Sequence, residues 1–409
     1  MFNRIFYISY DPGFLSIHCH EIVSNMISLG VDVDLFMPND VKLSFDLDGA
    51  CVTHRIPVYF KTTLLSSFFY QVLLIFGLLL TIKRDGRPDM IYARQNYLGI
   101  IPIFFARMFG IPYFAEMNGL TKRNGAGATD IRAIFKAFME RQCLKTANKV
   151  IVPSNTLRQR LIKGYRIRPD KIEVVPNGAN EDLFHPREDM GGLRKSLGLR
   201  NRDFVVGFVG SMGEWQGIEV LKESIKLTAS ETGNEKIKFL IVGDYVSDAS
   251  LSKMNEGRGE GRKDIEGFIA ANDLEDKVFY KGYVPYEESA EYMNICDVLV
   301  APYTKSSIAS GGGSPIKLFA YLACGKPVII SDLGEFTDSN MLRETGAAIL
   351  IPRDDSLALT KAIIELKKNS RVTTELGKKG RAFVLKERTW LHSATRILDI
   401  YDREYGKDR

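Results

Sequence analysis

One stretch of the chain combines the residue types that bind phosphate. It consists of Gly311, Gly312, Gly313, Ser314, Pro315, Ile316 and Lys317. Glycines let the backbone approach a ligand closely, while Ser314 is expected to cap a helix and Pro315 to occupy its first position. Free amides at a helix start bind anions, and a lysine in the first turn adds positive charge. The stretch therefore predicts a phosphate site, with a surface loop before a solvated lysine as the alternative.

This stretch lies in the second of two runs of alternating strands and helices. We expect seven strands between Arg4 and Val175 and six between Phe204 and Ile351. The alternation indicates parallel sheets, and continuous apolar runs such as FVVGFVG indicate strands buried on both faces. The predicted fold class is α/β, with two Rossmann-like, doubly wound domains facing a cleft lined by the carboxyl ends of their strands.

A polar, glycine-containing stretch near residues 185–200 marks the expected domain boundary. We assign residues 1–185 to an N-terminal domain on the acceptor side and residues 186–388 to a C-terminal domain. Residues 389–409 are expected to form a closing helix. Asn177 and Gly178 are expected to shape the turn that leaves the first domain, with Gly178 at a positive φ.

The composition narrows the functional classes. Of 409 residues, 45% are hydrophobic and 26% are charged, which excludes a disordered chain. The chain has 55 Lys and Arg residues and 50 Asp and Glu residues, which gives a net charge of +5. This charge favours binding of phosphates or an anionic membrane but is too small to indicate nucleic-acid binding. Five scattered cysteines without a CxxC pair favour a reducing, cytoplasmic location and neither disulfides nor zinc.

Several motifs occur along the chain in an order typical of one enzyme family. They are SIHCHEIVSNMISLGVDVDLF, PYFAEMNGL, VPNGANEDLF and SPIKLFAYLACGKPVIIS. These segments resemble glycosyltransferase family 4, and the resemblance covers essentially the whole chain. It implies the GT-B architecture with a C-terminal helix crossing back to the first domain, a nucleoside-diphosphate sugar as donor, retention of the anomeric configuration, and no metal or other cofactor. A helix N-terminus with cationic side chains can stabilise a departing diphosphate without Mg²⁺.

The resemblance places the donor in the second domain, with Lys317 on the diphosphate. The other expected donor-binding residues are Gly210, Ser211, Gln216, Tyr283, Val284, Gly311, Gly312, Gly313, Ser314, Pro315, Ile316 and Ala320. Plain packing is the alternative for Tyr283 and Val284. Two glutamates typical of the family are replaced by Gly312 and Ala320, and alanine cannot bind the ribose hydroxyls. Because Gln216 replaces a lysine that is common in the family, Lys317 is expected to neutralise more of the negative charge of the phosphates.

The first domain is expected to hold the transferred sugar and the acceptor. Glu116 and Asn118 follow a predicted strand and are the expected contacts at the reacting centre, with a buried structural carboxylate as the alternative for Glu116. Gly13 begins the loop after the first strand, where the backbone can approach donor or acceptor. His18 matches the helix histidine of the family. Arg94 ends a strand, where it suits an acceptor phosphate or a structural salt bridge.

One long apolar segment, Thr62–Ile82, is uncharged and flanked by basic residues. A spanning helix would put strands of one sheet on opposite sides of the bilayer, so we expect the segment to pack on that sheet. Its apolar side chains occupy nearly the whole helix circumference. This excess favours peripheral docking on the inner face of the plasma membrane, while a buried helix or a homodimer face are alternatives.

These observations predict a retaining glycosyltransferase. It would move a sugar from a UDP- or GDP-sugar to a hydroxyl of a glycan or polyprenyl-linked acceptor, in the synthesis of cell-surface polysaccharide or glycolipid. Two alternatives stay open. One is a sugar-nucleotide epimerase of the same architecture, for which the sequence offers no paired carboxylates in the cleft. The other is a homologue that binds a nucleotide sugar or a partner without turnover, which Ala320 and Gln216 favour.

Overall fold

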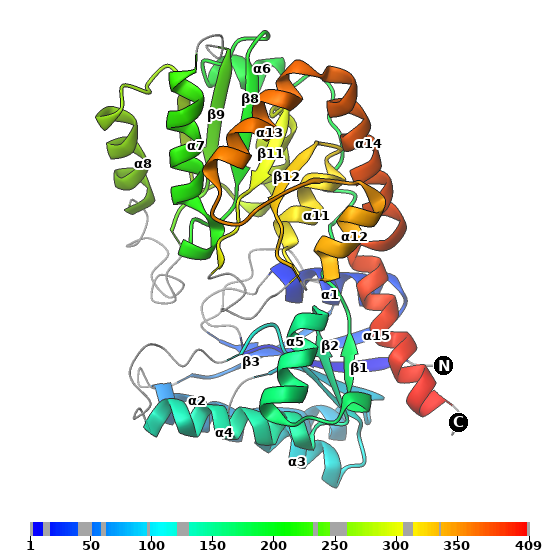
Figure 1. Cartoon of the computed structure of the whole chain (residues 1–409). Coiled ribbons are helices and arrows are strands. Elements are labelled where there is room, and N and C mark those ends of the chain that lie inside the picture. Colours follow the sequence, from blue (N-terminus) through cyan, green and yellow to red (C-terminus); the bar gives the residue numbers. More distant parts are fainter. Residues whose placement is uncertain are drawn as a thin grey trace. The chain divides into compact units, whose positions relative to one another are not determined.

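The chain forms two compact units, one of which is assembled from both ends of the sequence (Figure 1). The computed structural model describes residues 3–10, 17–39, 51–58, 63–95, 99–120, 131–231, 236–245, 260–305, 314–334 and 337–406. The first unit comprises Met1–Pro176 and Trp390–Arg409, and the second comprises Asn177–Thr389.

The second unit begins earlier than the expected boundary, because residues 177–185 pack with it. Phe184 is fully buried in the core of the second unit. The backbone N–H of Ala179 donates a hydrogen bond of 2.9 Å to the carbonyl of Arg388 near the end of that unit. Gly178 does not have the positive φ that the sequence suggested.

The first unit contains a parallel sheet of seven strands in the order β3-β2-β1-β4-β5-β6-β7. The strands are β1 (Arg4–Ile8), β2 (Asp32–Pro38), β3 (Val52–Ile56), β4 (Met90–Arg94), β5 (Tyr113–Glu116), β6 (Lys149–Val152) and β7 (Ile172–Val174). The chain winds outward from β1 in one direction and then from β4 in the other. The switch point between β1 and β4 is where an open parallel sheet of this kind binds ligands.

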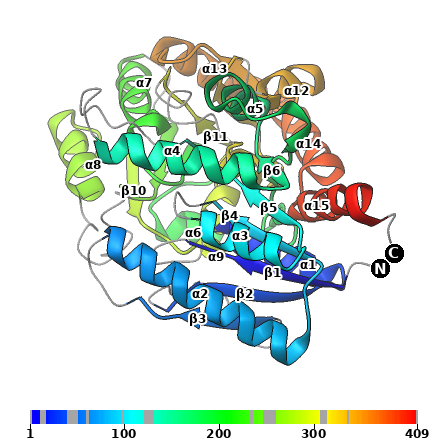
Figure 2. The same cartoon turned by 90° about the horizontal axis from the view of Figure 1, so that it is seen from below.

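Helices cover both faces of this sheet. They are α1 (Ile17–Ser28), α2 (Thr63–Asp85), α3 (Ile100–Met108), α4 (Ile131–Thr146), α5 (Asn155–Arg160) and α15 (Trp390–Tyr405), with short helices η1 (Leu161–Tyr165) and η2 (Pro169–Lys171). Figure 2 shows α2, α3 and α4 next to one another over one face, and Figure 1 shows α1 over the other. The C-terminal helix α15 packs against α1 within this unit.

Helix α2 corresponds to the long apolar segment and packs on the sheet as expected. Tyr70, Leu74 and Leu78 are buried at the spacing of four residues that defines one helix face. A Cβ atom at Gly77 would lie 3.1 Å from Cδ1 of Ile56, so the helix approaches the strands closely. Among the residues that the structure describes, no helix is both long and apolar enough to cross a membrane.

The second unit contains a parallel sheet of six strands in the order β10-β9-β8-β11-β12-β13. The strands are β8 (Phe204–Val209), β9 (Ile237–Val242), β10 (Val278–Gly282), β11 (Val298–Ala301), β12 (Val328–Ser331) and β13 (Ile349–Ile351). The helices are α6 (Gly191–Ser196), α7 (Ile218–Ser230), α8 (Glu260–Ala271), α9 (Tyr286–Asn294), α11 (Ile316–Ala323), α12 (Thr337–Thr345), α13 (Ser356–Lys368) and α14 (Ser370–Glu387), with the short η3 (Glu214–Gln216). Both predicted strand sets are confirmed.

The central strands of the second sheet are apolar throughout because both of their faces are buried. Along β8, Val205 and Val209 join the core formed with α9, α11 and α14. Val206 and Phe208 point to the opposite face and join the core formed with α7, α8 and α13. Successive side chains of a strand alternate between faces, so a doubly covered strand gives the continuous apolar run seen in the sequence.

A substitution within β8 tests how closely this core is packed. A Cβ atom at Gly207 would lie 2.3 Å from Sγ of Cys296 and 2.8 Å from Cδ2 of Leu299. We expect Gly207→Ala to lower the free energy of unfolding in urea by about 1–3 kcal/mol, because the neighbouring side chains must shift. Gly267→Ala on α8 is the matched control, since nothing lies within 4 Å of its Cβ position. It should raise the stability by about 0.5–1 kcal/mol, and equal effects of the two changes would contradict the packing.

Candidate active site

A buried ammonium group lies at the carboxyl ends of β8 and β11. Lys317 is in the first turn of α11, and its Nζ lies 4.2 Å from the ring centre of Phe208 and 4.8 Å from that of Tyr303. Within the described part of the chain, this Nζ has no hydrogen-bond partner. Burial lowers the pKa of Lys317 to about 7, because the charged form has lost its water. Since β8 and β11 flank the switch point of the sheet, the group is placed for ligand binding.

Two glycines keep the space beside this lysine open. Gly210 follows β8 at φ +154°, and a Cβ atom there would lie 3.2 Å from Cδ of Lys317. Gly243 follows β9 at φ +133°, and its Cβ would lie 1.9 Å from the carbonyl oxygen of Gly210. A side chain at either position would displace the backbone or the lysine. Gly210 and Lys317, both expected at the donor site, are therefore neighbours.

Polar groups continue along the loop after β8. Nε2 of Gln216 lies 3.5 Å from Oγ of Ser211, so these two expected donor contacts also lie together. Gln216 is buried, and its Oε1 has no hydrogen-bond partner among the described residues. The loop therefore presents an amide and a hydroxyl, and among the described residues of this group Lys317 carries the positive charge.

Helix α11 starts one residue later than expected. It begins at Ile316, with Pro315 as the residue before the helix at φ −78° and ψ 106°. Ser314 does not cap the helix, because its hydroxyl donates instead to Oδ2 of Asp338 at 2.9 Å. The first amides of a helix have no partner within it, so the anion-binding character predicted for this end is retained without a side-chain cap.

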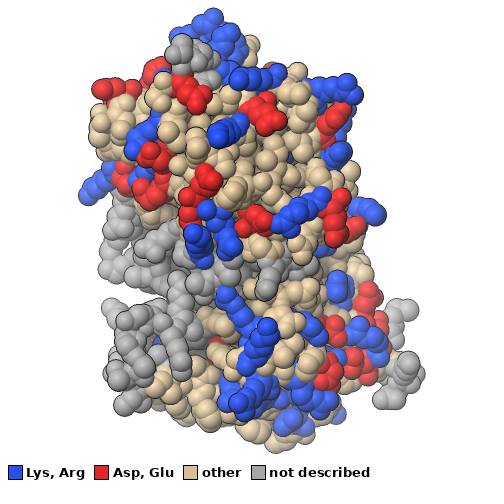
Figure 3. Space-filling model, in the orientation of Figure 1, with Lys and Arg blue, Asp and Glu red and all other residues tan. Residues whose placement is uncertain are grey.

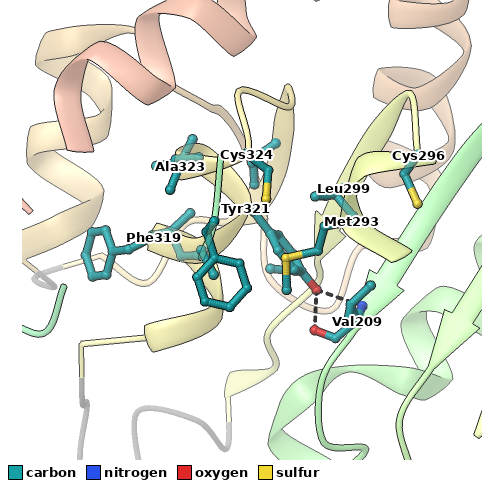
Figure 4. Packing of buried hydrophobic residues seen from close by; sticks show 14 of the residues in the cluster. Val209, Met293, Cys296, Leu299, Phe319, Tyr321, Ala323 and Cys324 are labelled. Atoms are coloured by element: carbon teal, nitrogen blue, oxygen red, sulfur yellow. Dashed lines mark hydrogen bonds between the residues drawn. The ribbon is translucent and has the colours of Figure 1, made fainter. Parts of the chain in front are cut away.

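Tyr321 fastens α11 to the end of β8 (Figure 4). Its hydroxyl donates to the carbonyl of Val209 at 2.7 Å and accepts from the N–H of the same residue at 2.8 Å. All of these groups are buried. Because Val209 directly precedes Gly210 and Tyr321 lies one turn after Lys317, this pair of bonds fixes the helix relative to the loop. No local sequence pattern indicates this role.

The other donor-side residues lie in different surroundings. Ala320 is 2% exposed and packs in the core, so it offers only a methyl group. Tyr283 follows β10 and is exposed, whereas Val284 packs against the core as the packing alternative proposed. Gly13, Gly311, Gly312 and Gly313 lie outside the described residues.

The first unit places a buried carboxylate at the carboxyl ends of its central strands. Glu116 ends β5 and is 2% exposed. Nδ2 of Asn118 donates to its Oε1, and Nδ1 of His18 lies 3.3 Å from the same oxygen. The hydroxyl of Tyr7 donates to Oε2 at 3.5 Å. Arg94 of β4 is the register partner of Glu116 across the sheet. The structure thus gathers His18, Arg94, Glu116 and Asn118.

Among the described residues, the Glu116 carboxylate is contacted through side chains. Sequence analysis missed two members of this cluster. Burial holds the pKa of Tyr7 well above its usual value, so its hydroxyl is a neutral donor to the carboxylate. Trp390, the first residue of α15, packs edge-on against His18 with ring centres 5.1 Å apart. The tryptophan lies far from the histidine in sequence, so only the folded unit shows this contact.

Within the described ranges, no group of three or more His, Cys, Asp and Glu residues is close enough to bind a metal ion. Burial lowers the pKa of His20, two residues from His18, to about 4, so its imidazole is neutral.

Two sequence families match the two units. Residues 15–178 match the glycosyl transferase 4-like domain, and residues 190–383 match the glycosyl transferases group 1. A D-inositol 3-phosphate glycosyltransferase of Streptomyces scabiei is 23% identical over 350 residues, which cover 79% of this chain and 74% of that protein.

Two further proteins are similar. A UDP-Gal:alpha-D-GlcNAc-diphosphoundecaprenol alpha-1,3-galactosyltransferase of Escherichia coli is 24% identical over 259 residues, 59% of this chain and 64% of that protein. The structure of Anabaena HepE in complex with UDP has a TM-score of 0.74 at 16% identity and covers 98% of this chain and 100% of that one, which shows a shared fold. With both of its parallel-sheet units matched, the chain belongs to the group 1, family 4-type glycosyltransferases of GT-B fold.

Proposed function

We propose that this glycosyltransferase moves a hexose from a UDP- or GDP-sugar to a hydroxyl of a glycan or lipid-linked acceptor, with retention and without a metal cofactor. The observation that carries the proposal is the buried ammonium of Lys317 at the start of α11, which has no hydrogen-bond partner among the described residues. Cleavage of the sugar–phosphate bond leaves a diphosphate with additional negative charge. A fixed cation and free helix amides stabilise that charge as it develops.

The first unit is proposed to hold the transferred sugar and the acceptor. Glu116 is buried and paired, so it acts by orienting Asn118 and His18. These two side chains would contact the sugar, and Arg94 would contact an acidic acceptor. The Streptomyces relative is named for a phosphorylated inositol and the Escherichia coli relative for a lipid diphosphate, which supports an acceptor of this chemistry.

The proposed role of Lys317 predicts a specific pH dependence for UDP binding. The terminal phosphate of UDP has its second pKa near 6, so its charge is constant from pH 7 to pH 9. Lys317, with a pKa of about 7, loses its proton over this range. Because the site needs the ammonium form, UDP affinity measured by calorimetry should fall with rising pH, by about tenfold per unit well above pH 7.

Substitutions at Lys317 distinguish the contribution of its charge to UDP binding from that of the rest of the site. Lys317→Arg stays charged, so the pH dependence should disappear, whereas Lys317→Met should bind UDP weakly at every pH. Lys238→Met, at the amino end of β9, is the control and should behave like the wild type. The donor site would be refuted if the affinities for UDP and GDP stayed constant with pH and were the same in the wild type and in Lys317→Met.

Peripheral membrane docking is also part of the proposal, because three neighbouring helices expose large apolar side chains. These are Phe68, Phe69, Phe76, Leu79 and Leu80 on α2, Phe104 and Met108 on α3, and Ile134, Phe135 and Phe138 on α4. Lys83, Arg84 and Arg107 are exposed at the ends of α2 and α3. Lys and Arg also gather on the face of this unit shown in Figure 3. Apolar side chains with basic neighbours suit an anionic lipid surface.

Vesicle binding tests this surface. We expect the double variant Phe76→Ser and Leu80→Ser to bind phosphatidylglycerol vesicles at least about tenfold more weakly, since each large apolar side chain contributes about 1.5–3 kcal/mol when fully buried. Leu357→Ser on α13, whose side chain is half exposed in the second unit, is the control and should bind like the wild type. If the double variant binds vesicles like the wild type, or if the wild type is a dimer and the double variant is not, the surface has a partner other than the membrane.

A second candidate function is nucleotide-sugar binding without turnover, and the uncharged side chains of Ala320 and Gln216 favour it. Ala320→Glu distinguishes the two candidates. If the chain is an active enzyme, the added carboxylate should raise turnover about tenfold or more, because a charged hydrogen bond contributes about 1.5–3 kcal/mol. Ala320→Leu fills the same space without an acceptor and should give no gain. Absence of sugar transfer in wild type and variant, with UDP still bound, would favour the binding protein.

A further inference from the structure

Ser314, which precedes the start of α11, is held by side chains from two distant parts of the second unit. Nδ2 of Asn177 donates to its carbonyl at 2.7 Å, and its own hydroxyl donates to Oδ2 of Asp338 at 2.9 Å. Asn177, Ser314 and Asp338 are at most 7% exposed. The backbone that leads into Lys317 is therefore fixed through both its main chain and its side chain.

The same group reaches the segments by which the chain enters and leaves the second unit. Asn177 is the first residue of this unit, and Arg388 is next to its last residue, Thr389. Nε of Arg388 lies 3.9 Å from Oδ1 of Asp338. The two segments also bond directly, since the Ala179 N–H donates to the Arg388 carbonyl and Ala179 forms a β-bridge with Thr389. Asp338 thus connects the helix start to the exit segment, and Asn177 connects it to the entry segment.

Two acceptors of this network are incompletely satisfied. Oδ1 of Asn177 and Oδ1 of Asp338 are buried and have no hydrogen-bond partner among the described residues. Burial raises the pKa of Asp338 to about 6, although Arg388 and Ser314 oppose the shift. Buried networks that serve only as scaffolding are normally satisfied throughout. The ion pair with Arg388, at 3.9 Å, is the contact that the structure gives to Oδ1 of Asp338.

We propose that Asn177 and Asp338 are positioning residues for the donor site. They hold the start of α11 in the orientation in which Lys317 meets the diphosphate, and they transmit occupancy of that site to residues 177–179 and 388–389. This role rests on the proposed donor function of Lys317. It gives the asparagine of the VPNG motif a task beyond shaping a turn.

Variants of the two residues test the positioning role. Asn177→Ala and Asp338→Ala should each weaken UDP binding about tenfold. Asp338→Asn retains an acceptor for the Ser314 hydroxyl and should stay within about threefold of the wild type. Asp355→Ala is the matched control, because it removes a side-chain cap of α13 in the same unit without touching α11. It should lower the unfolding temperature and leave UDP affinity unchanged. Alanine variants that bind UDP like the wild type would overturn the proposal.

Hydrogen exchange tests the transmission. In the wild type, saturating UDP should slow exchange of the amides in 177–180 and 386–389 as well as those of α11. In the double variant Asn177→Ala and Asp338→Ala, which lacks both connections, saturating UDP should protect α11 alone. Protection confined to α11 in the wild type would overturn the link.

A ligand-free measurement separates this proposal from the donor function. Without UDP, the first turn of α11 should exchange faster in Asn177→Ala than in Asp355→Ala. If the wild type binds neither UDP nor GDP, the donor function fails, and this comparison alone decides whether Asn177 positions the helix. Equal exchange in the two variants would refute that role.

Discussion

The ammonium of Lys317 is buried against two aromatic rings, and the described residues offer it no hydrogen-bond partner. Such an arrangement is unfavourable for the isolated protein, because a desolvated charge without a counter-ion is costly. The neighbouring structure keeps it in place. Tyr321 fixes α11 to β8, Asn177 holds Ser314 just before α11, and glycines leave the space beside Lys317 open. An anion that enters this space meets a charge already oriented and dehydrated, so little of the binding free energy is spent on reorganisation.

The buried charge of the first unit, in contrast, has polar partners. The carboxylate of Glu116 contacts Asn118, His18 and Tyr7 and has no need of a ligand. A satisfied carboxylate is a rigid point from which neighbouring amide and imidazole groups are oriented. In the proposed function the two units have complementary roles. The second offers a buried cation to the diphosphate, and the first offers fixed polar groups to the sugar hydroxyls.

Local patterns predicted the elements well because their causes are local. Apolar runs identified all strands of both sheets, and the glycines, Pro315 and Lys317 indicated the helix start to within one residue. Errors arose where a distant partner decides the structure. The Ser314 hydroxyl bonds to Asp338 and so does not cap its own helix, and residues 177–185 follow the packing of Phe184.

Sequence analysis selected His18, Arg94, Glu116 and Asn118, which lie together in the first unit, but not the residues that contact them. Tyr7 and Trp390 have no motif, since one is an ordinary strand residue and the other begins a helix at the far end of the chain. The same holds for Tyr321, whose hydroxyl finds a backbone partner on another element. Contacts that depend on chain topology cannot be read from spacing alone.

The return of α15 to the first unit has a consequence for how the protein is made. Trp390 packs on His18, and the Ser393 hydroxyl donates to the carbonyl of Pro176, so the first unit is incomplete until the ribosome has added residues 390–405. The second unit is continuous in sequence and can fold earlier, as an insertion within an unfinished neighbour. The cluster around Glu116, which includes His18 and Trp390, is thereby completed only at the end of synthesis.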